Sequence, residues 1–599
     1  MASFSSTYPS QRPVFSLDAA NAGRLDPRMT FTRASTANVF DGSKHLSSEN
    51  LIAYSNPVTS QWTETNTAIT VNSTAAPDGT NTASNVLETA ATGYHEIRET
   101  FACTNAVSHT ATFYAKANGR TVVRFLPRTS SGVIANVEFT LSGAGSESLI
   151  SGTATRSIAA VGSGGWYKLT VTFTGNATAT GEFQVNICES AGTDSYAGDA
   201  TKGVYLWGAQ VASTGEIVLN GTSGQIHREY APSLVSKSNN IGRFDYSTDG
   251  QSAAKGILIE GQTQNLNSYS EDFSHANYNK FDGSIESNAA IAPDGNLTAD
   301  LFVEDTGTST HYISKAVSTG LSVGSTQYAI SVYAKSAGRS KIKMYDNGQS
   351  TPGTTVFDLA NGTVISGAGN IEACGNGWYR CTVIPTADYG TIGTPTIMLD
   401  NGSGTNYQGD GYSGVLLWGL QLETGNGSGT THSSSYIGTT SSTVTRAAES
   451  LSVATADIGY TGGPVTVVGE VTGGQGYYPT IMRMSGPQDR LVLYKDSATA
   501  ANATNNIAYV QVGSTLTASG TIAGSYGSTK VAITSDTDRV AYTADGGAVT
   551  VDTSSPVVSI NNMTIGVGSS SGTELNANLK RLVIYGESMS DTNLQALTS

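Results

Sequence analysis

The side chains that could carry out catalysis are scattered along this chain. Histidine occurs seven times, and only His95 and His311 occupy comparable positions, beside Tyr94 and Tyr312. The sequence contains no GxSxG elbow, HExxH helix or phosphate-binding loop. Cleavage of a polysaccharide needs two carboxylates about 5–10 Å apart in a cleft, and sequence leaves such a pair open. We therefore predict a protein that is not an enzyme, with a capsule polysaccharide depolymerase as an alternative.

Tryptophan supplies the clearest signal for a binding surface, because the flat face of an indole can stack on a sugar ring. Trp207 and Trp418 lie in apolar runs, so we expect them to fill a core. Trp166 and Trp378 each follow a glycine-rich turn and are better candidates for exposure, with a place in the core as the alternative. We name Trp166 and Trp378 as candidate glycan contacts.

These tryptophans belong to a module that occurs twice, at offsets of 378 − 166 = 212 and 418 − 207 = 211 residues. The copies share the landmarks NLxxYS at 50–55 and 265–270, APDG at 76–79 and 292–295, YAK at 114–116 and 333–335, GWY at 165–167 and 377–379, and a closing LWG strand at 206–211 and 417–422. The period is too long for a solenoid repeat, so each copy is expected to fold as a domain.

The positions of these residues depend on short strands. Residues 167–173 alternate between apolar and polar side chains, a period of two that is typical of strands with one buried face. Amphipathic helical stretches of twelve or more residues do not occur before the C-terminus. We predict an all-β protein of tandem antiparallel β-sandwich (jelly-roll) domains with almost no helix. The expected divisions are an N-terminal arm and strand at 1–49, a first module at 50–218, a packed connector at 219–262, a second module at 263–423, a linker at 424–445 and a further sandwich at 446–599.

Composition argues against several kinds of partner. The net charge is −15 with a pI near 4.9, and no basic run occurs, so we expect no nucleic-acid binding. No stretch approaches eighteen consecutive apolar residues, so we expect no membrane insertion. The first thirty residues lack the apolar core of a signal peptide, so we expect the protein to be made in a cytosol.

Cys374 and Cys381 bracket a turn and could form a bridge, but free buried thiols are the favoured interpretation.

Several short phrases recur in a characteristic order: TFTRAST, RFDY followed by GILIE, NLNSYSEDF, APDG, YAK, GNGWYRC, LLWGLQLE, TRAAES and RLVIYGESMSDTNLQALT. Together they resemble bacteriophage tail and fibre proteins, which carry tandem jelly rolls similar to carbohydrate-binding modules and a terminal domain like concanavalin A or laminin G. The resemblance covers about residues 30–599. It departs from the usual arrangement because residues 50–218 separate TFTRAST from RFDY. We expect the first module to be inserted between two strands that pair with each other.

The resemblance implies a virion protein that is assembled in the host cytoplasm and exposed on the phage particle. It implies binding to host surface glycan, contacts to other virion proteins through the N-terminal region, and a homotrimer. It also implicates Glu271, Asp272 and Asp410 in a structural calcium site. Calcium prefers about six to eight oxygen ligands, so a plain turn aspartate is the alternative for Asp410, and no other cofactor is expected. We predict a tail fibre or receptor-binding protein that binds glycan without cleaving it; a purely structural capsid or tail decoration is the alternative.

Overall fold

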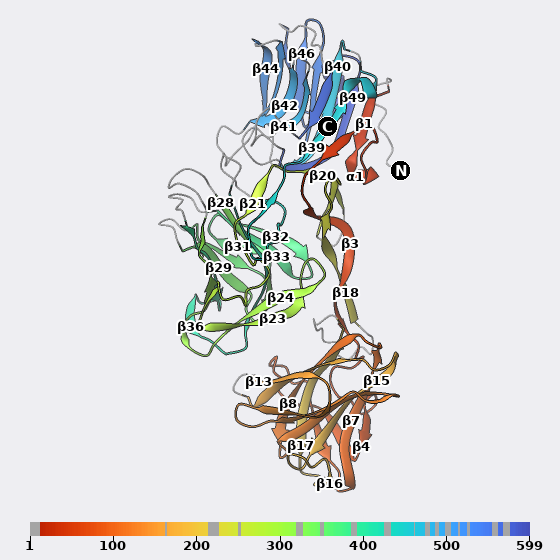
Figure 1. The fold of residues 1–599 in the computed structure, drawn as a ribbon, viewed down its shortest axis with the longest axis vertical. Helices are drawn as coiled ribbons and strands as arrows, with labels where there is room; N and C mark the ends of the chain where they lie inside the picture. Colours follow the sequence, from red (N-terminus) through yellow and green to blue (C-terminus); the bar gives the residue numbers. More distant parts are fainter. Residues whose placement is uncertain are drawn as a thin grey trace.

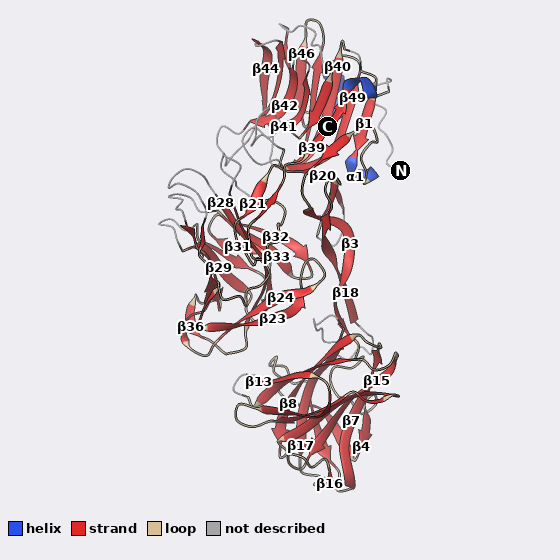
Figure 2. Cartoon of the chain, viewed as in Figure 1, coloured by secondary structure: helices blue, strands red, loops and turns tan. Residues whose placement is uncertain are grey.

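The structure is a computed structural model that describes residues 12–599 except 162–163, 214–226, 249–252, 319–327, 348–352, 385–391, 425–432, 461, 474–479, 486–489, 497–504, 513–514, 524–527, 554–560 and 567–574. Strands dominate, which confirms the all-β prediction (Figure 2). Within the described ranges, helix is limited to α1 (Ala19–Ala22), the 3-10 turn η1 (Thr455–Ile458) and α2 (Asp591–Thr598). Figure 1 shows three β-sheet bodies along the long axis, with the first module at one end and the C-terminal sandwich at the other.

The first module is a sandwich of two antiparallel sheets. Its strands are β4 (Thr63–Thr65), β5 (Thr67–Thr74), β6 (Ala83–Glu88), β7 (Thr92–Cys103), β8 (Ser108–Asn118), β9 (Val122–Thr129), β10 (Gly132–Val133), β11 (Ala135–Thr140), β12 (Ser146–Gly152), β13 (Thr155–Val161), β14 (Trp166–Thr174), β15 (Ala179–Cys188), β16 (Ser195–Ala197) and β17 (Gly203–Ala212). One sheet has the order β12-β11-β9-β15-β7-β16, and the other β13-β14-β8-β17-β6-β5. Phe113, Phe125 and Phe183 meet between them, with ring centroids 4.6–5.5 Å apart. Burial of these aromatic faces holds the two sheets together.

The second module repeats this architecture. Its strands are β21 (Thr263–Asn265), β22 (Asn279–Phe281), β23 (Gly283–Ile291), β24 (Leu297–Glu304), β25 (Thr308–Thr310), β26 (Tyr312–Ser314), β27 (Val317–Ser318), β28 (Tyr328–Ala337), β29 (Lys341–Asp346), β30 (Thr355–Asp358), β31 (Thr363–Ser366), β32 (Asn370–Gly375), β33 (Trp378–Val383), β34 (Ile392–Gly393), β35 (Pro395–Asp400), β36 (Asn406–Gln408) and β37 (Gly414–Thr424). The two main sheets have the orders β23-β24-β37-β28-β33-β32 and β22-β26-β35-β29-β30-β31. The sequence duplication is therefore a duplication of fold.

The C-terminal sandwich is built from distant parts of the chain. Its strands are β1 (Phe15–Asp18), β2 (Thr30–Thr32), β19 (Arg243–Tyr246), β20 (Ala254–Ile259), β39 (Ser450–Ala454), β40 (Val465–Gly473), β41 (Thr480–Ser485), β42 (Arg490–Asp496), β43 (Asn505–Val512), β44 (Thr515–Ala523), β45 (Ser528–Ser535), β46 (Val540–Ala544), β47 (Thr550–Asp552), β48 (Asn562–Ile565) and β49 (Ala577–Tyr585). The strands β1 and β20 both pair with β49, and β2 pairs with β39. Phe15, Leu17 and Ile257 are buried in the same core as Val467 and Ile584.

Residues 1–49 were expected to form an arm and a strand for attachment, but their described part packs into the C-terminal sandwich. The described part of residues 1–49 supplies two strands to the C-terminal sandwich, and the connector supplies two more through β19 and β20. The sandwich therefore extends beyond residues 446–599. A role of residues 1–49 in attachment to other virion proteins stays a prediction.

The first module is inserted at the tip of a two-stranded ribbon, but the strands of TFTRAST and RFDY, which were expected to pair there, do not: β2 pairs with β39, and β19 pairs with β20. The strands β3 (Ala37–Asn50) and β18 (His227–Lys237) pair antiparallel, and the residue pair Asn50–His227 lies next to the module. This ribbon runs beside the second module in Figure 1. Its Leu234 amide donates to the Pro293 carbonyl oxygen at 2.8 Å, in the APDG turn of the second module.

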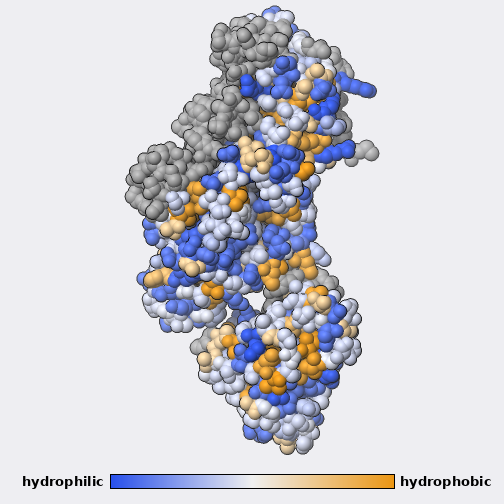
Figure 3. All heavy atoms as spheres, viewed as in Figure 1, coloured by the Kyte–Doolittle hydropathy of each residue, from blue (hydrophilic) through white to orange (hydrophobic). Residues whose placement is uncertain are grey.

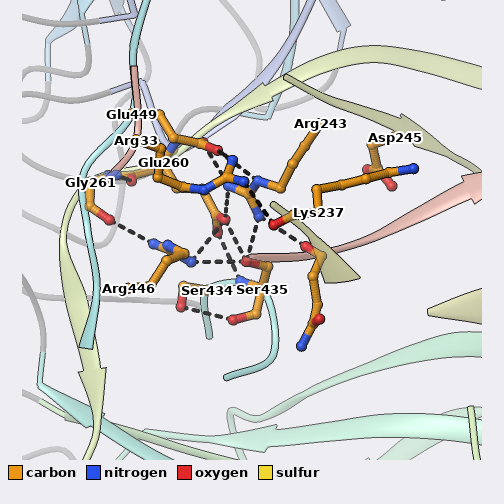
Figure 4. Close-up of polar contacts among 12 residues, drawn as sticks. Arg33, Lys237, Arg243, Asp245, Glu260, Gly261, Ser434, Ser435, Arg446 and Glu449 are labelled. Carbon is orange, nitrogen blue, oxygen red and sulfur yellow. Dashed lines mark hydrogen bonds and ion pairs between the residues drawn. The ribbon is translucent and has the colours of Figure 1, made fainter. Parts of the chain in front are cut away.

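A buried network of charges lies where the ribbon, the second module and the C-terminal sandwich meet (Figure 4). Glu449 accepts hydrogen bonds from Arg33 at 2.7 Å and from two nitrogens of Arg243, while Glu260 accepts from Arg243 at 2.6 Å and from Arg446 at 2.9 Å. All five side chains are buried. Burial alone would raise the pKa of Glu260, but Arg446 and Arg243 hold it well below its ordinary value. We call these five residues the charge node.

The charge node explains several of the phrases in the sequence. Arg33 comes from TFTRAST, Arg243 from RFDY, Glu260 from GILIE, and Arg446 and Glu449 from TRAAES. The short strand β38 (Val444–Arg446) pairs with β21 and brings Arg446 into place. Arg33 has one carboxylate partner and also donates to the carbonyl oxygens of Ser35, Lys237, Ser238 and Ile241. These phrases therefore contain the residues that form the junction between the ribbon, the second module and the C-terminal sandwich.

A buried carboxyl group in the first module predicts a pH dependence of stability. Glu99 on β7 is 8% exposed between Ile97 and Phe101, and burial raises its pKa from 4.5 to about 7. The folded state favours the protonated carboxyl, so it loses stability as the pH rises from about 4.5 to about 7. We expect Glu99→Gln to leave stability unchanged at pH 4 and to raise it by up to about 3 kcal/mol at pH 8. Thermal unfolding at both pH values measures this, and an equal effect at both would contradict it.

Candidate functional site

The two tryptophans named from the sequence are core residues. Trp166 is 4% exposed and its Nε1 donates to the Ala75 carbonyl oxygen, while Trp378 is 3% exposed and donates to the Ile291 carbonyl oxygen. Each indole fills the space under the turn that leads into the APDG sequence. Their expected exposure is therefore corrected, because neither indole face is available to stack on a sugar.

The three carboxylates implicated in calcium binding do not come together. Glu271 accepts a hydrogen bond from the Tyr436 hydroxyl at 2.8 Å, and Asp272 accepts from Ser274. Asp410 accepts from the backbone amide of Ser413 and forms an ion pair with Arg339 at 3.2 Å. Over the described residues, no cluster of three or more His, Cys, Asp or Glu could hold a metal ion. The calcium expectation is corrected, and Asp410 is a turn aspartate with an arginine partner.

The paired histidines and the cysteines are structural as well. Each buried imidazole lies within hydrogen-bonding distance of backbone carbonyl oxygens: His95 of Asn66 at 2.8 Å, and His311 of Asp282 at 2.6 Å. All four cysteines are free and buried, which agrees with the favoured interpretation of Cys374 and Cys381.

A different pair of aromatic residues recurs in the two modules. Tyr114 and Trp207 are neighbours in register on β8 and β17, with ring centroids 5.3 Å apart and an interplanar angle of 61°. Their counterparts Tyr333 and Trp418 (333 − 114 = 219; 418 − 207 = 211) have centroids 5.3 Å apart at 63°. We call each pair, with the sheet around it, the aromatic face of its module.

The chain itself covers the aromatic face of the second module. Residues 433–439, which we call the strap, lie across it. The Tyr436 ring lies 4.6 Å from Trp418 and 5.9 Å from Tyr333 between centroids, and its side chain is 2% exposed. At the other end of the strap, Ser433 shares a hydrogen bond with Thr382 at 3.0 Å. This part of the expected linker 424–445 is packed, and residues 425–432 lie outside the described residues.

The corresponding segment of the first module takes a different course. After the closing strand β17, the sequence Tyr-Ala-Pro-Ser at 230–233 corresponds to Tyr-Ile-Gly-Thr at 436–439. In the first module this segment belongs to β18 and pairs with β3, so it forms the ribbon. Tyr230 is 62% exposed there. The tyrosine that closes one aromatic face is therefore directed away from the other.

These two tyrosines make a matched pair of predictions. Tyr436→Ala removes a buried ring that packs on Tyr333 and Trp418 and the hydrogen bond from its hydroxyl to Glu271. We therefore expect the free energy of unfolding to fall by about 3–5 kcal/mol. Tyr230→Ala removes an exposed ring and should change stability by about 0.5 kcal/mol or less. Chemical denaturation of both variants measures the difference, and similar losses would refute the assignment of the strap.

The aromatic face of the first module opens into a cleft between the two modules. A cavity of about 400 Å³ is lined from the first module by the rings of Tyr114 and Trp207 and by the charged groups of Asp78 and Lys168. The second module contributes Tyr412, which is 43% exposed, together with Glu286, Leu301, Val303 and Gly411. Figure 3 shows the notch between these two bodies.

The chemistry of the cleft suits a polyhydroxylated ligand. The rings of Tyr114, which is half-buried, and Tyr412 can pack on the C–H face of a sugar, whereas Trp207 is 7% exposed, as expected for a core residue. Asp78, Lys168 and Glu286 offer an acceptor, a donor and a second acceptor for hydroxyl groups. Several of these positions have counterparts in the second module that already contact the chain: Trp418 and Tyr333 contact Tyr436, Thr382 (for Thr170) contacts Ser433, and Pro293 (for Pro77) contacts Leu234. In the second module, residues of the strap and of the ribbon thus occupy the places that line the cleft in the first.

Neither the protein-family models nor the curated proteins give a match to this chain. Among solved structures it is similar to a CBM40 of the Ruminococcus gnavus IT-sialidase bound to α2,6 sialyllactose, with 19% identity and a TM-score of 0.19 over 24% of this chain and 87% of that one. It is also similar to the CBM22 tandem of Paenibacillus barcinonensis Xyn10C, with 11% identity and a TM-score of 0.18 over 65% and 98%. The LG1–3 region of the laminin α2 chain matches with 9% identity and a TM-score of 0.19 over 83% and 96%. Likenesses this weak carry no argument about ligands.

Across the part of the chain that the structure describes, no helix is long and apolar enough to cross a membrane.

Proposed function

We propose that this chain is a glycan-binding protein and that the cleft between its two modules is the binding site. The single observation that carries the proposal is the contrast between the aromatic faces. The second is closed by Tyr436, whereas the first lines a cavity of about 400 Å³. The Tyr436 ring packs against the Tyr333–Trp418 pair. In the Tyr114–Trp207 pair of the same geometry Trp207 is 7% exposed, so Tyr114 is the ring that a sugar would contact.

We further propose that the protein is a phage virion appendage that binds host surface glycan during adsorption. The resemblance of its sequence phrases to tail and fibre proteins supports this role. Three of these phrases supply Arg33, Arg243 and Arg446 to the charge node. Single-sugar contacts are weak, so a homotrimer would supply affinity through multivalency. Light scattering at micromolar concentration tests the trimer, and a monomer would contradict it.

The structural alternative also has an observation in its favour. The charge node ties the bodies together through fully buried ion pairs, which suits a rigid spacer as well as an adhesin. The depolymerase alternative would use the carboxylates of Asp78 and Glu286, which line the same cleft. The three roles differ in what happens to a polysaccharide: it is bound, left unbound or cleaved.

Binding of the full-length protein to host surface polysaccharide and its oligosaccharide fragments tests the proposal. Tyr412→Ala removes an exposed ring from the cleft and should weaken binding by about tenfold or more. The control Tyr94→Ala removes a ring that is 52% exposed outside the cleft and should leave affinity unchanged. No binding by the wild-type protein would favour the spacer, and release of reducing ends would favour the depolymerase.

A further inference from the structure

The second module carries an unusual surface on its other sheet, the one that faces away from the strap. Four side chains follow one another across hydrogen-bonded strands: Phe281 on β22, Tyr312 on β26, Met398 on β35 and Lys343 on β29 are successive partners in register. Tyr345 lies two residues beyond Lys343 on the same strand and the same face. We call these five residues the aromatic–lysine row.

The row points away from the core of the module. Residues that alternate with it, Ile313, Ile397 and Met344, are buried in the hydrophobic core. Because successive side chains of a strand point to opposite faces, the row lies on the outer face of the sheet. Phe281 is 45% exposed, Tyr312, Lys343 and Tyr345 are half-buried, and Met398 between Tyr312 and Lys343 is 7% exposed.

The geometry of the row is that of a flat platform beside a cation. Phe281 stacks on Tyr312 with centroids 5.0 Å apart and an interplanar angle of 16°. The Nζ of Lys343 lies 5.4 Å from the centroid of the Tyr345 ring, and no carboxylate of the described residues forms an ion pair with it. Lys341, by contrast, is in register with Asp358 and Asp400. Although the chain has a net charge of −15, no carboxylate of the described residues pairs with the Lys343 ammonium group, so this group is available to an acidic ligand.

The same face of the first module carries different residues at the equivalent positions. Tyr312 corresponds to Glu96 (312 − 96 = 216) and Lys343 to Arg124 (343 − 124 = 219). Glu96 accepts a hydrogen bond from Gln184, and Arg124 forms ion pairs with Glu138 at 3.0 Å and Asp194 at 2.5 Å. Glu96 and Arg124 therefore both have polar partners within the first module. At the equivalent positions the second module has Val356 in place of Glu138 and Tyr312 in place of Glu96.

We propose that the aromatic–lysine row binds a carboxylate-bearing sugar, a hexuronate residue of a polysaccharide. The sugar ring would pack on Phe281 and Tyr312, and its carboxylate would accept a charge-assisted hydrogen bond from Lys343. Adjacent strands are about 4.8 Å apart, so Lys343 lies about 10 Å from Tyr312 across β35, a span that a sugar ring and a flexible lysine fill together. This inference rests on the proposed glycan binding but uses a different face of a different module.

Calorimetric titration of the full-length protein with oligogalacturonate, and with the same oligomer reduced to galactose at C6, tests the inference. We expect the acidic oligomer alone to bind at this face, and to bind more weakly at about 0.5 M salt. Lys343→Met should weaken its binding by about tenfold or more, while the control Lys341→Met should change it by about twofold or less. Phe281→Ala should weaken it also, because the sugar ring loses its platform.

Several results would overturn the inference: no binding of oligogalacturonate at millimolar concentration, equal binding of the reduced oligomer, or unchanged binding by the Lys343→Met variant. The Tyr412→Ala variant, measured in parallel, distinguishes a wrong assignment of the aromatic–lysine row from a wrong assignment of the cleft as a glycan-binding site. If Tyr412→Ala abolishes glycan binding while Lys343→Met and Phe281→Ala do not weaken it, the cleft is the site and the row is not.

Discussion

Residues 446–599, produced alone, are expected to remain unfolded. The fragment lacks β1, β2 and β20, and with them Phe15, Leu17, Ile257 and Ile259, which lie in the core of the sandwich. It also leaves the central strand β49 without two of its partners and exposes its backbone hydrogen-bonding groups. Circular dichroism and amide exchange of the fragment measure this. A cooperative thermal transition of the isolated fragment would contradict the account of how the sandwich is built.

Removal of the first module is the matched control for that experiment. Asn50 and His227 are paired at the tip of the ribbon, so an Asn-Gly turn in place of residues 51–226 should close β3 and β18 as a hairpin. We expect this shortened chain to fold, because the second module, the charge node and the C-terminal sandwich remain complete. It should also lose binding at the cleft. An unfolded product would show that the first module is integral to the rest of the fold.

Glu449→Ala is expected to cost about 3–5 kcal/mol of stability. The substitution leaves Arg33, Arg243 and Arg446 buried with one carboxylate, Glu260. Burial already lowers the pKa of Arg33, so its guanidinium depends on this partner. Denaturant unfolding of the full-length protein measures the loss.

An exposed ion pair supplies the control. Glu182→Ala removes a carboxylate that is 34% exposed and 3.5 Å from Arg98 and Arg128, and should cost about 1 kcal/mol or less. If Glu449→Ala costs no more than Glu182→Ala, the charge node does not hold the bodies together. Because the pKa of Glu260 is depressed, the node contributes stability above the ordinary carboxyl pKa of 4.5 and loses it as the pH falls below that value.

The sequence predicted the repeat and the fold class well, because both depend on local patterns. Period-two alternation marks individual strands, and the phrases GWY and LWG mark equivalent strands in the two modules. The insertion of the first module followed from the displaced phrases TFTRAST and RFDY, but the strands that pair at the insertion are β3 and β18, whereas the TFTRAST strand β2 pairs with β39 and the RFDY strand β19 with β20.

Long-range pairing was the part that local patterns did not reveal. Residues 14–17 contain an alternating strand signal, but nothing nearby shows that Phe15 and Leu17 complete a sandwich formed by the end of the chain. Trp166 looked exposed because it follows glycines, yet it packs with Ala76 and Ala83 from another strand and turn.

The aromatic face of the first module was missed for a related reason. Tyr114 and Trp207 were visible as YAK and LWG, but their importance depends on where Tyr436 and Tyr230 lie. A comparison of the segments that follow the two closing strands would have given a signal, since one contains Tyr-Ala-Pro-Ser and the other Tyr-Ile-Gly-Thr. The different course of these segments follows from tertiary pairing with β3.

Amide hydrogen exchange of the full-length protein, with and without a bound host oligosaccharide, tests the central claim most directly. We predict that the ligand slows exchange in β13 and β14 of the first module and around Tyr412 of the second, because these segments line the cleft. Slower exchange confined to the C-terminal sandwich, with none at the cleft, would contradict the claim.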